Sequence, residues 1–86
     1  MMFVLKEKKF GQDAIYQTVV YGGVEKLARI LSNPSERYYI IQGKGHFFNY
    51  VEIYDHGRQI GEYDGYHNKL VLPEYLRRKL DEKVRE

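Results

Sequence analysis

Glycine-centred turns divide the second half of the chain into short β-prone runs, and this alternation constrains the fold more than any other feature. The turn segments are Gly43-Lys44-Gly45, Asp55-His56-Gly57 and Asp64-Gly65. Asp-Gly favours a two-residue hairpin because both turn positions need positive φ, and Asp-His-Gly is typical of a three-residue turn with a left-handed glycine. The pattern predicts an antiparallel meander. Its expected strands are Glu36 to Gln42, His46 to Tyr54, Arg58 to Tyr63 and Tyr66 to Leu72.

The first twenty-one residues predict a further hairpin, with strands from Phe3 to Phe10 and from Ala14 to Tyr21. The second run is rich in β-branched and aromatic residues, which favour pleated structure. A helix from about residue 13 is the alternative, since its apolar residues also fit a helical stripe. Gly22-Gly23 would cost such a helix about 1 kcal/mol per glycine relative to alanine. The choice between strand and helix stays open at this point.

Two segments show helical spacing. Val24, Leu27, Ala28 and Leu31 stand at i, i+3, i+4 and i+7, which predicts a helix over about residues 24–32 that ends before Asn33-Pro34. Pro73 opens a second helix over about residues 73–85, which carries a narrow apolar stripe. The sequence therefore predicts an α+β fold: an antiparallel sheet of about four to six strands, one central helix and one C-terminal helix.

Length and composition indicate one small domain spanning residues 1–86. The chain has no cysteine, which excludes disulfides and thiolate metal sites and suits a reducing compartment. The apolar start is short and is followed at once by Lys6-Glu7-Lys8-Lys9, so we expect neither a signal peptide nor a membrane span there. We predict a cytoplasmic protein without a membrane partner.

No residue set indicates a reaction. Nucleophile elbows, phosphate loops and dinucleotide fingerprints are missing from the sequence, so we expect neither an enzyme nor a cofactor. Glu62 and His67 flank the Asp64-Gly65 turn and predict a solvated cross-strand pair. Turn direction alternates in a meander, which places His56 at the opposite end of the sheet from His46 and His67. A three-histidine metal site is therefore not expected.

The formal net charge of +2 is too small to identify a nucleic-acid-binding protein, so the placement of the cations matters. Lys44, His46, His67 and Lys69 are predicted at one end of the meander. Arg77 and Arg78 lie on the C-terminal helix, where acidic residues four positions away favour a largely self-paired surface.

Part of the meander resembles the loop and hairpin of double-stranded-RNA-binding domains, over roughly residues 24–69. The motifs are Gly43-Lys44-Gly45-His46, Val51-Glu52-Ile53-Tyr54, Gly57-Arg58, Ile60-Gly61-Glu62, Gly65 and Lys69. The resemblance implies a helix, three strands and a second helix, with His46 as the minor-groove loop histidine and Lys69 as a phosphate contact. The chain departs from the family in lacking the loop proline, in reducing the lysine cluster to Lys69, and in delaying the second helix through Pro73.

These observations lead to two functional hypotheses. The first is non-catalytic nucleic-acid binding, double-stranded RNA before DNA, by the six basic and histidine residues Lys44, His46, His67, Lys69, Arg77 and Arg78. The second is a protein-interaction module. It would dock a protein partner through a tyrosine-rich surface formed by Tyr38, Tyr50, Tyr54 or Tyr63, or pair an exposed sheet edge with a second copy to form a homodimer.

Overall fold

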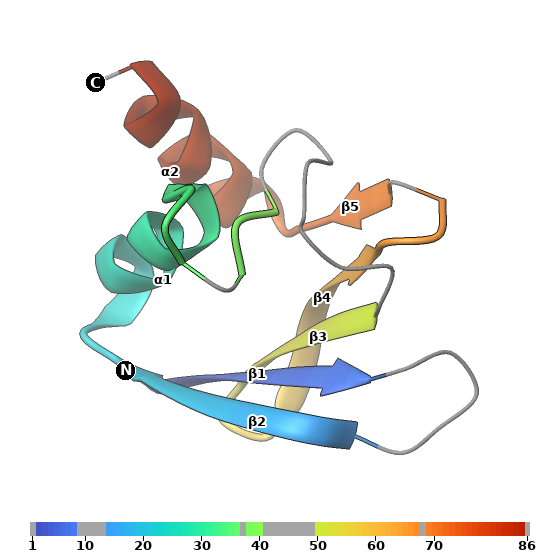
Figure 1. Cartoon of the computed structure of the whole chain (residues 1–86). Coiled ribbons are helices and arrows are strands. Elements are labelled where there is room, and N and C mark those ends of the chain that lie inside the picture. The colour runs from blue at the N-terminus through green and yellow to red at the C-terminus, as the bar shows by residue number, and fades with distance from the viewer. Residues whose placement is uncertain (1, 9–13, 37, 41–49, 68, 86) are drawn as a thin grey trace.

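Five antiparallel strands form a single sheet in the computed structural model, which describes residues 2–8, 14–36, 38–40, 50–67 and 69–85. The strands are β1 (Met2–Lys8), β2 (Ala14–Tyr21), β3 (Tyr50–Asp55), β4 (Arg58–Asp64) and β5 (Lys69–Val71). Their order is β2-β1-β3-β4-β5, so the N-terminal hairpin joins the meander through the pairing of β1 with β3 (Figure 1). The predicted α+β class and antiparallel meander are confirmed, and Ala14–Tyr21 is a strand and not a helix.

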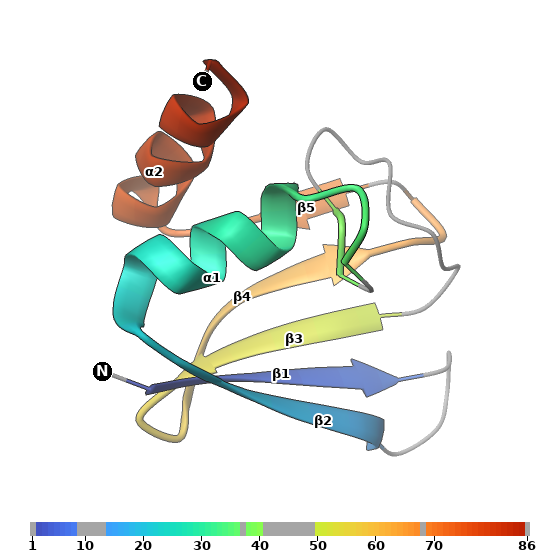
Figure 2. The same ribbon diagram turned by 60° about the vertical axis from the view of Figure 1, so that its left-hand side comes forward.

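Both helices cover the same face of this sheet (Figures 1 and 2). They are α1 (Gly23–Ser32) and α2 (Glu74–Arg85), within a residue of their predicted bounds. Gly22 adopts a left-handed conformation with φ of 109°, which lets the chain leave β2 and turn directly into α1. The apolar stripes face the sheet: Leu27, Ala28 and Leu31 of α1 and Leu76 and Leu80 of α2 are buried.

Alternation along the strands gives the sheet one covered face and one open face. On β1, Phe3 and Leu5 point toward the helices and are fully buried, and the same parity buries Val51 and Ile53 on β3 and Tyr63 on β4. Glu7 follows the inward parity of β1 and is 1% exposed. It is the only charged side chain that is buried among the described residues, and the sequence patterns did not identify it.

The predicted strand from Glu36 to Gln42 is wrong over the residues that the structure describes. Residues 36 and 38–40 form turns and irregular backbone, with Ile40 N–H donating to the Leu31 carbonyl (3.1 Å). Tyr38 is buried, and its hydroxyl lies 3.1 Å from Thr18 Oγ1 on β2. The β-prone Tyr38-Tyr39-Ile40 run therefore covers the end of α1 and the inner face of β2 instead of extending the sheet.

The two described turns of the meander differ from their predicted types. His56 (φ 53°) and Gly57 (φ 77°) form a two-residue turn between β3 and β4, with both positions at positive φ as in a type I′ hairpin. Gly65 does not adopt positive φ, and the connection from β4 to β5 runs over residues 65–68. The Asp64 carboxylate accepts the backbone N–H groups of Tyr66 and His67 (3.0 and 3.2 Å), which replaces the expected two-residue turn.

Several predicted boundaries are shorter in the structure. The strands expected at Tyr66 to Leu72 and His46 to Tyr54 are β5 and β3, and the strand expected at Phe3 to Phe10 is β1. Residues 9–10, 41–49 and 68 lie outside the described residues, and with them the predicted Gly43-Lys44-Gly45 turn and His46. The turn at 55–58 and the connection at 64–69 do lie at opposite ends of the sheet, as predicted.

Gly61 allows β5 to lie close to β4. A Cβ at this position would stand 2.7 Å from the Val71 carbonyl oxygen and 3.2 Å from Leu72 Cδ2. We expect Gly61→Ala to push β5 outward and to destabilise the protein by about 1–3 kcal/mol, as overpacking does. Chemical denaturation measures the change. The neighbouring Glu62→Ala, on the open face, serves as the control and should stay within about 0.5 kcal/mol of wild type; equal effects of both variants would contradict the close approach.

Glu25 connects the two helices electrostatically. Its carboxylate contacts Lys83 and lies 3.0 Å from Lys79, which itself reaches Glu82 (3.3 Å). Hydrogen bonds from Lys83 and then Lys79 lower the pKa of Glu25 from 4.5 to about 2. The ionised carboxylate therefore helps to hold α2 against α1.

The lowered pKa gives a defined acid dependence. A depressed carboxyl pKa stabilises the fold above the unfolded value of about 4.5, and this contribution is lost as pH falls toward 2. In thermal unfolding measured from pH 5 to pH 2, we expect Glu25→Gln to be less stable than wild type at pH 5 and to converge with it at pH 2. Glu74→Gln, which breaks an exposed pair with Arg78, is the control. Parallel curves for Glu25→Gln and wild type would contradict the assigned role of Glu25.

Candidate functional site

Strand β2 forms one margin of the sheet. Among the described residues it pairs with β1 alone, and Figures 1 and 2 both draw it as the outermost strand on the side away from β5. Its sequence, Ala-Ile-Tyr-Gln-Thr-Val-Val-Tyr, contains no charge, no proline and no glycine. Proteins commonly protect edge strands with charges, proline, bulges or very short lengths. Only one such device is present in β2, the register irregularity near Lys8 and Ala14.

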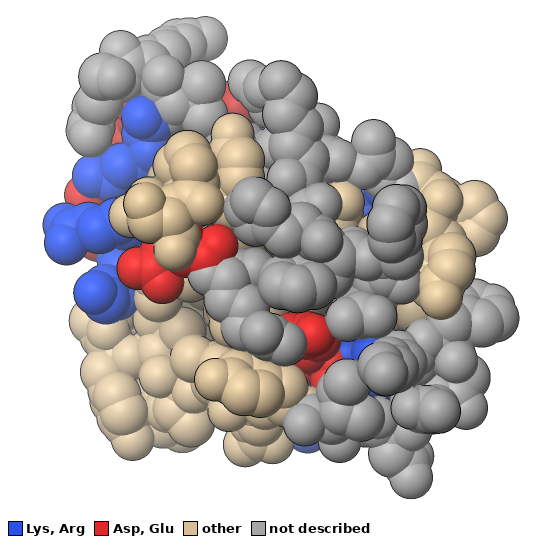
Figure 3. Space-filling model, in the orientation of Figure 1, with Lys and Arg blue, Asp and Glu red and all other residues tan. Residues whose placement is uncertain are grey.

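Large apolar side chains are exposed along this strand. Tyr21 is 71% exposed and Val19 is 39% exposed, and both belong to the open face; Met2, which pairs with Tyr21, is 41% exposed. In Figure 3 most of the visible lysines and arginines gather on the side where Figure 1 draws the helices, while the part of the lower margin that is not grey, on the left, is tan. The β2 edge thus has no charged side chain and carries exposed apolar side chains.

The direction of the β2 backbone follows from the opposite end of the sheet. Arg77 Nη2 donates to the Leu70 carbonyl (3.1 Å), so the backbone of Leu70 points away from β4. Antiparallel strands point their backbone groups alternately to one neighbour and to the other. Leu70 pairs with Tyr63, Tyr63 with Val51, Val51 with Glu7, and Glu7 with Tyr16. Following the alternation through these pairs shows that the backbone groups of Tyr16 point toward β1. The same parity turns Thr18 and Val20 inward and leaves the N–H and C=O groups of Gln17, Val19 and Tyr21 facing outward.

The other edge of the sheet is protected. Strand β5 has only three residues, begins with a lysine, and has the Arg77 guanidinium on the outward Leu70 carbonyl. Short length and charge are the usual means of keeping an edge from pairing. Within the described part of the chain, β2 is therefore the edge suited to accept a further strand.

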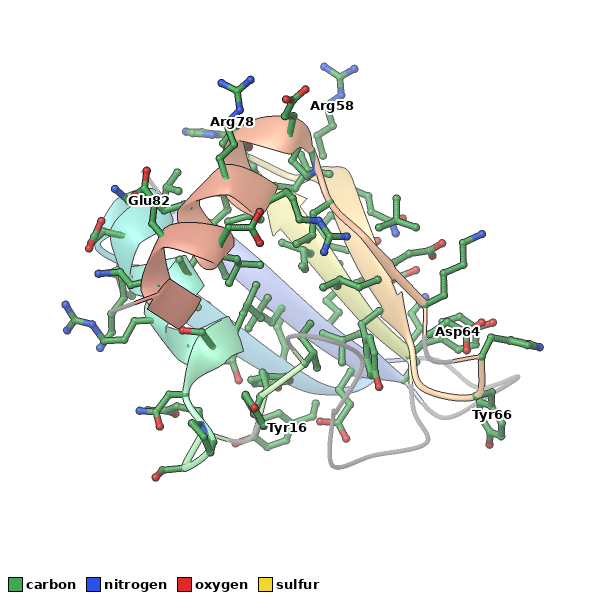
Figure 4. All side chains as sticks on the ribbon, turned by 90° about the horizontal axis from the view of Figure 1, so that it is seen from above. Tyr16, Arg58, Asp64, Tyr66, Arg78 and Glu82 are labelled. Carbon is green, nitrogen blue, oxygen red and sulfur yellow. The ribbon has the colours of Figure 1, made fainter. Side chains whose placement is uncertain are left out.

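The structure separates the described members of the predicted nucleic-acid site. His67 lies in the connection before β5, and Lys69 is exposed at the start of β5. Arg77 donates to the carbonyl of Leu70, the neighbour of Lys69. Arg78 instead pairs with Glu74 (2.8 Å) on the exposed side of α2. Figure 4 shows Arg78 at the end of the molecule opposite to Asp64 and Tyr66. Arg58 lies at the same end as Arg78, although it is not among the six predicted site residues. Lys44 and His46 lie outside the described residues.

Asp64, and not Glu62, is the partner of His67. His67 Nδ1 lies 2.7 Å from Asp64 Oδ2, and the Tyr50 hydroxyl donates to the same oxygen (3.0 Å). Burial alone would raise the pKa of Asp64, but the hydrogen bonds from His67, Tyr50 and the two backbone amides outweigh it and lower that pKa. The predicted pair with Glu62 is wrong because Glu62 stands opposite Val71 on β5. The His67 side chain is 73% exposed, so this is a solvated loop contact.

Other histidine and carboxylate groups are similarly dispersed. His56 Nδ1 contacts Asp55 Oδ1 (2.6 Å) at the β3–β4 turn, the other end of the sheet from His67. In the ranges that the structure describes, no three His, Cys, Asp or Glu side chains come close enough together to hold a metal ion.

Two of the four tyrosines expected at a protein interface lie inside the fold. Tyr38 and Tyr63 are buried, so this part of the prediction is wrong. Tyr50 and Tyr54 are half-buried on the open face, where Tyr54 donates to Glu52 (3.0 Å) and Lys6 lies 4.4 Å above the Tyr54 ring. The exposed tyrosines are Tyr16, Tyr21, Tyr66 and Tyr75.

Comparisons of this chain with protein-family models, with curated proteins and with solved structures return no match. None of the described helices is long and apolar enough to cross a membrane.

Proposed function

We propose that this protein is a non-catalytic interaction protein that binds a partner by adding a strand to the outer edge of β2. The observation that carries the proposal is the outward row of backbone groups at Gln17, Val19 and Tyr21 on a strand without charge, proline or glycine. In strand addition, main-chain hydrogen bonds supply affinity and alternate side chains supply specificity.

The energetics of the edge support this function. An open edge of high β propensity is an aggregation hazard, and the other edge of the same sheet is protected by Arg77 and by its short length. Exposed Val19 and Tyr21 add apolar area that a docking strand would remove from water, at about 25 cal/mol per Å². A partner strand would thus satisfy the outward backbone groups and cover these side chains together.

The test uses an array of eight-residue peptides rich in Val, Thr and Tyr, including the Ala14–Tyr21 sequence itself, probed with labelled protein. We expect wild type to bind a subset of the peptides and Gln17→Pro to lose them, since proline removes an outward donor and blocks the approach of a strand. Tyr75→Ala, which removes an exposed tyrosine far from β2 in the chain, should bind as wild type does. Binding by Gln17→Pro that equals wild type, or no binding of any peptide, would contradict strand addition at β2.

Nucleic-acid binding is a second candidate, supported by two observations. From α1 to α2 the described elements are a helix, three antiparallel strands and a helix, the order that the resemblance to double-stranded-RNA-binding domains implies. Arg58 and Arg78 project from the same end of the molecule (Figure 4). Glu74 lies beside Arg78, so the local net charge is small and only weak phosphate binding would be expected.

A salt titration with duplex RNA and duplex DNA tests this candidate. We expect weak binding, with a salt slope that is shallower by about 1 in Arg58→Ala and in Arg78→Ala, because each variant removes one phosphate-binding cation. Lys69→Ala changes a residue of the site predicted from the sequence, at the other end of the sheet. It therefore distinguishes binding at that predicted site from binding at the end that carries Arg58 and Arg78. An affinity that none of the three variants changes, or no binding at low salt, would exclude the candidate.

A further inference from the structure

We infer that the strand added to β2 is the β2 strand of a second copy, paired antiparallel about a two-fold axis at Thr18. This inference rests on the proposed function and names its partner. The result would be a homodimer with one continuous ten-stranded sheet, flanked by the short β5 strand of each copy.

The parity of β2 fits this pairing. When two identical strands pair antiparallel about a two-fold axis, the numbers of any two opposed residues add up to the same value. The residues whose backbone N–H and C=O groups point outward must also lie opposite one another, so that they can form hydrogen bonds. A centre at Thr18 sets Gln17 opposite Val19 of the copy, and Val19 opposite Gln17, so outward backbone groups meet on both sides of the axis. It also aligns residues 16–20, which lie on the regular side of the irregularity near Ala14, and the two outward pairs form about four main-chain hydrogen bonds.

The side chains fit as well. On the covered face, Tyr16 would stand opposite Val20 of the copy, an aromatic and β-branched pair of the kind that stabilises sheets. Because β2 has no charged residue, self-pairing brings no like charges together along the strand. A second copy of β2 is therefore a partner strand that matches this edge in both charge and side-chain type.

The two sheet edges explain why the assembly would close. Each copy offers one pairing edge, because Arg77 and the short β5 protect the other. An isologous contact then uses up the one unprotected edge among the described strands and stops at a dimer, whereas two open edges would continue into a filament. The exposed parts of Tyr16 and Tyr21 provide on the order of 200 Å² per copy. That places the contact at the small end of specific interfaces, so we expect a weak dimer whose population rises with concentration.

Cysteine cross-linking tests the pairing directly, because the chain has no cysteine of its own. Directly opposed residues stand about 5.5 Å apart between Cα atoms, within disulfide reach, while diagonal residues stand about 7–8 Å apart. Mild oxidation of a mixture of Gln17→Cys and Val19→Cys should therefore give a disulfide-linked heterodimer. Neither variant alone should cross-link efficiently. Cross-linking of either variant alone would contradict a two-fold at Thr18.

Sedimentation velocity over a concentration series supplies the second readout. We expect wild type to shift from monomer toward dimer and Gln17→Pro to remain monomeric, with the circular dichroism of both showing a folded chain. A wild-type protein that stays monomeric, with no cross-link in the mixture, would overturn the second-copy inference. If wild type stays monomeric but still binds peptides of the array, and Gln17→Pro abolishes that binding, the proposed function stands without the second-copy inference. If Gln17→Pro changes neither peptide binding nor sedimentation, both the proposed function and the second-copy inference fail.

Discussion

Replacing Leu27 by alanine is expected to lower the free energy of unfolding by about 2–5 kcal/mol. Leu27 is fully buried where α1 meets the sheet, so its truncation removes apolar packing and leaves a cavity. Alanine is itself a good helix former, so the change reports packing and not helix propensity. A chain of 86 residues has a total stability of about 4–13 kcal/mol, and the variant should therefore unfold at a much lower denaturant concentration or fail to fold.

The neighbouring Lys26→Ala gives the matched control. Lys26 is exposed on the same turn of α1, and its replacement should change stability by no more than about 0.5 kcal/mol. Urea denaturation of the three proteins, at equal concentration, gives the comparison. If Leu27→Ala and Lys26→Ala unfolded at the same urea concentration, the packing of α1 on this face of the sheet would be wrong.

Prolines at two adjacent positions of β2 are expected to have very different effects. Thr18→Pro removes an N–H that points to β1 and also the hydroxyl near Tyr38, and should cost on the order of 3 kcal/mol. Gln17→Pro removes an outward N–H of an edge strand and should change stability by about 1 kcal/mol or less. The contrast follows from backbone direction together with the loss of the Thr18 hydroxyl contact with Tyr38.

Thermal unfolding at low protein concentration separates the two variants, because self-pairing contributes little there. Greater destabilisation by Gln17→Pro would mean that the assigned backbone direction of β2 is reversed, and equal destabilisation would mean that backbone direction does not decide the effect of these prolines. A reversed direction would contradict the outward row of backbone groups at Gln17, Val19 and Tyr21 on which the proposed function rests.

The helices and most of the meander could be predicted because their signals are local. The spacing of Val24, Leu27 and Leu31 fixes the buried face of α1, and the breaks at Asn33-Pro34 and Pro73 fix the ends of both helices. The segment after α1 was predicted wrongly because its β-prone residues are used for packing. Tyr38 and Ile40 bury their side chains against β2 and α1 without joining the ladder, and pattern alone cannot distinguish these two uses of apolar residues.

The candidate site could be predicted only in part. The uncharged composition of residues 14–21 is visible in the sequence, but its importance depends on sheet order. β1 inserts between β2 and β3, which leaves β2 at the margin, and no local signal specifies that pairing. The contact of His67 with Asp64 was missed for a similar reason, since it depends on a longer connection than the Asp64-Gly65 pair suggests.

Residue-resolved hydrogen exchange of the β2 amides, measured with the partner strand bound, tests the central claim most directly. The partner strand is a second copy at high concentration or a selected peptide from the array. In the isolated monomer, the inward amides of Thr18 and Val20 should exchange slowly and the outward amides of Gln17, Val19 and Tyr21 quickly. Strand addition predicts that the outward amides become as slow as the inward ones when the partner binds. Rapid exchange of the outward amides under every binding condition would contradict it.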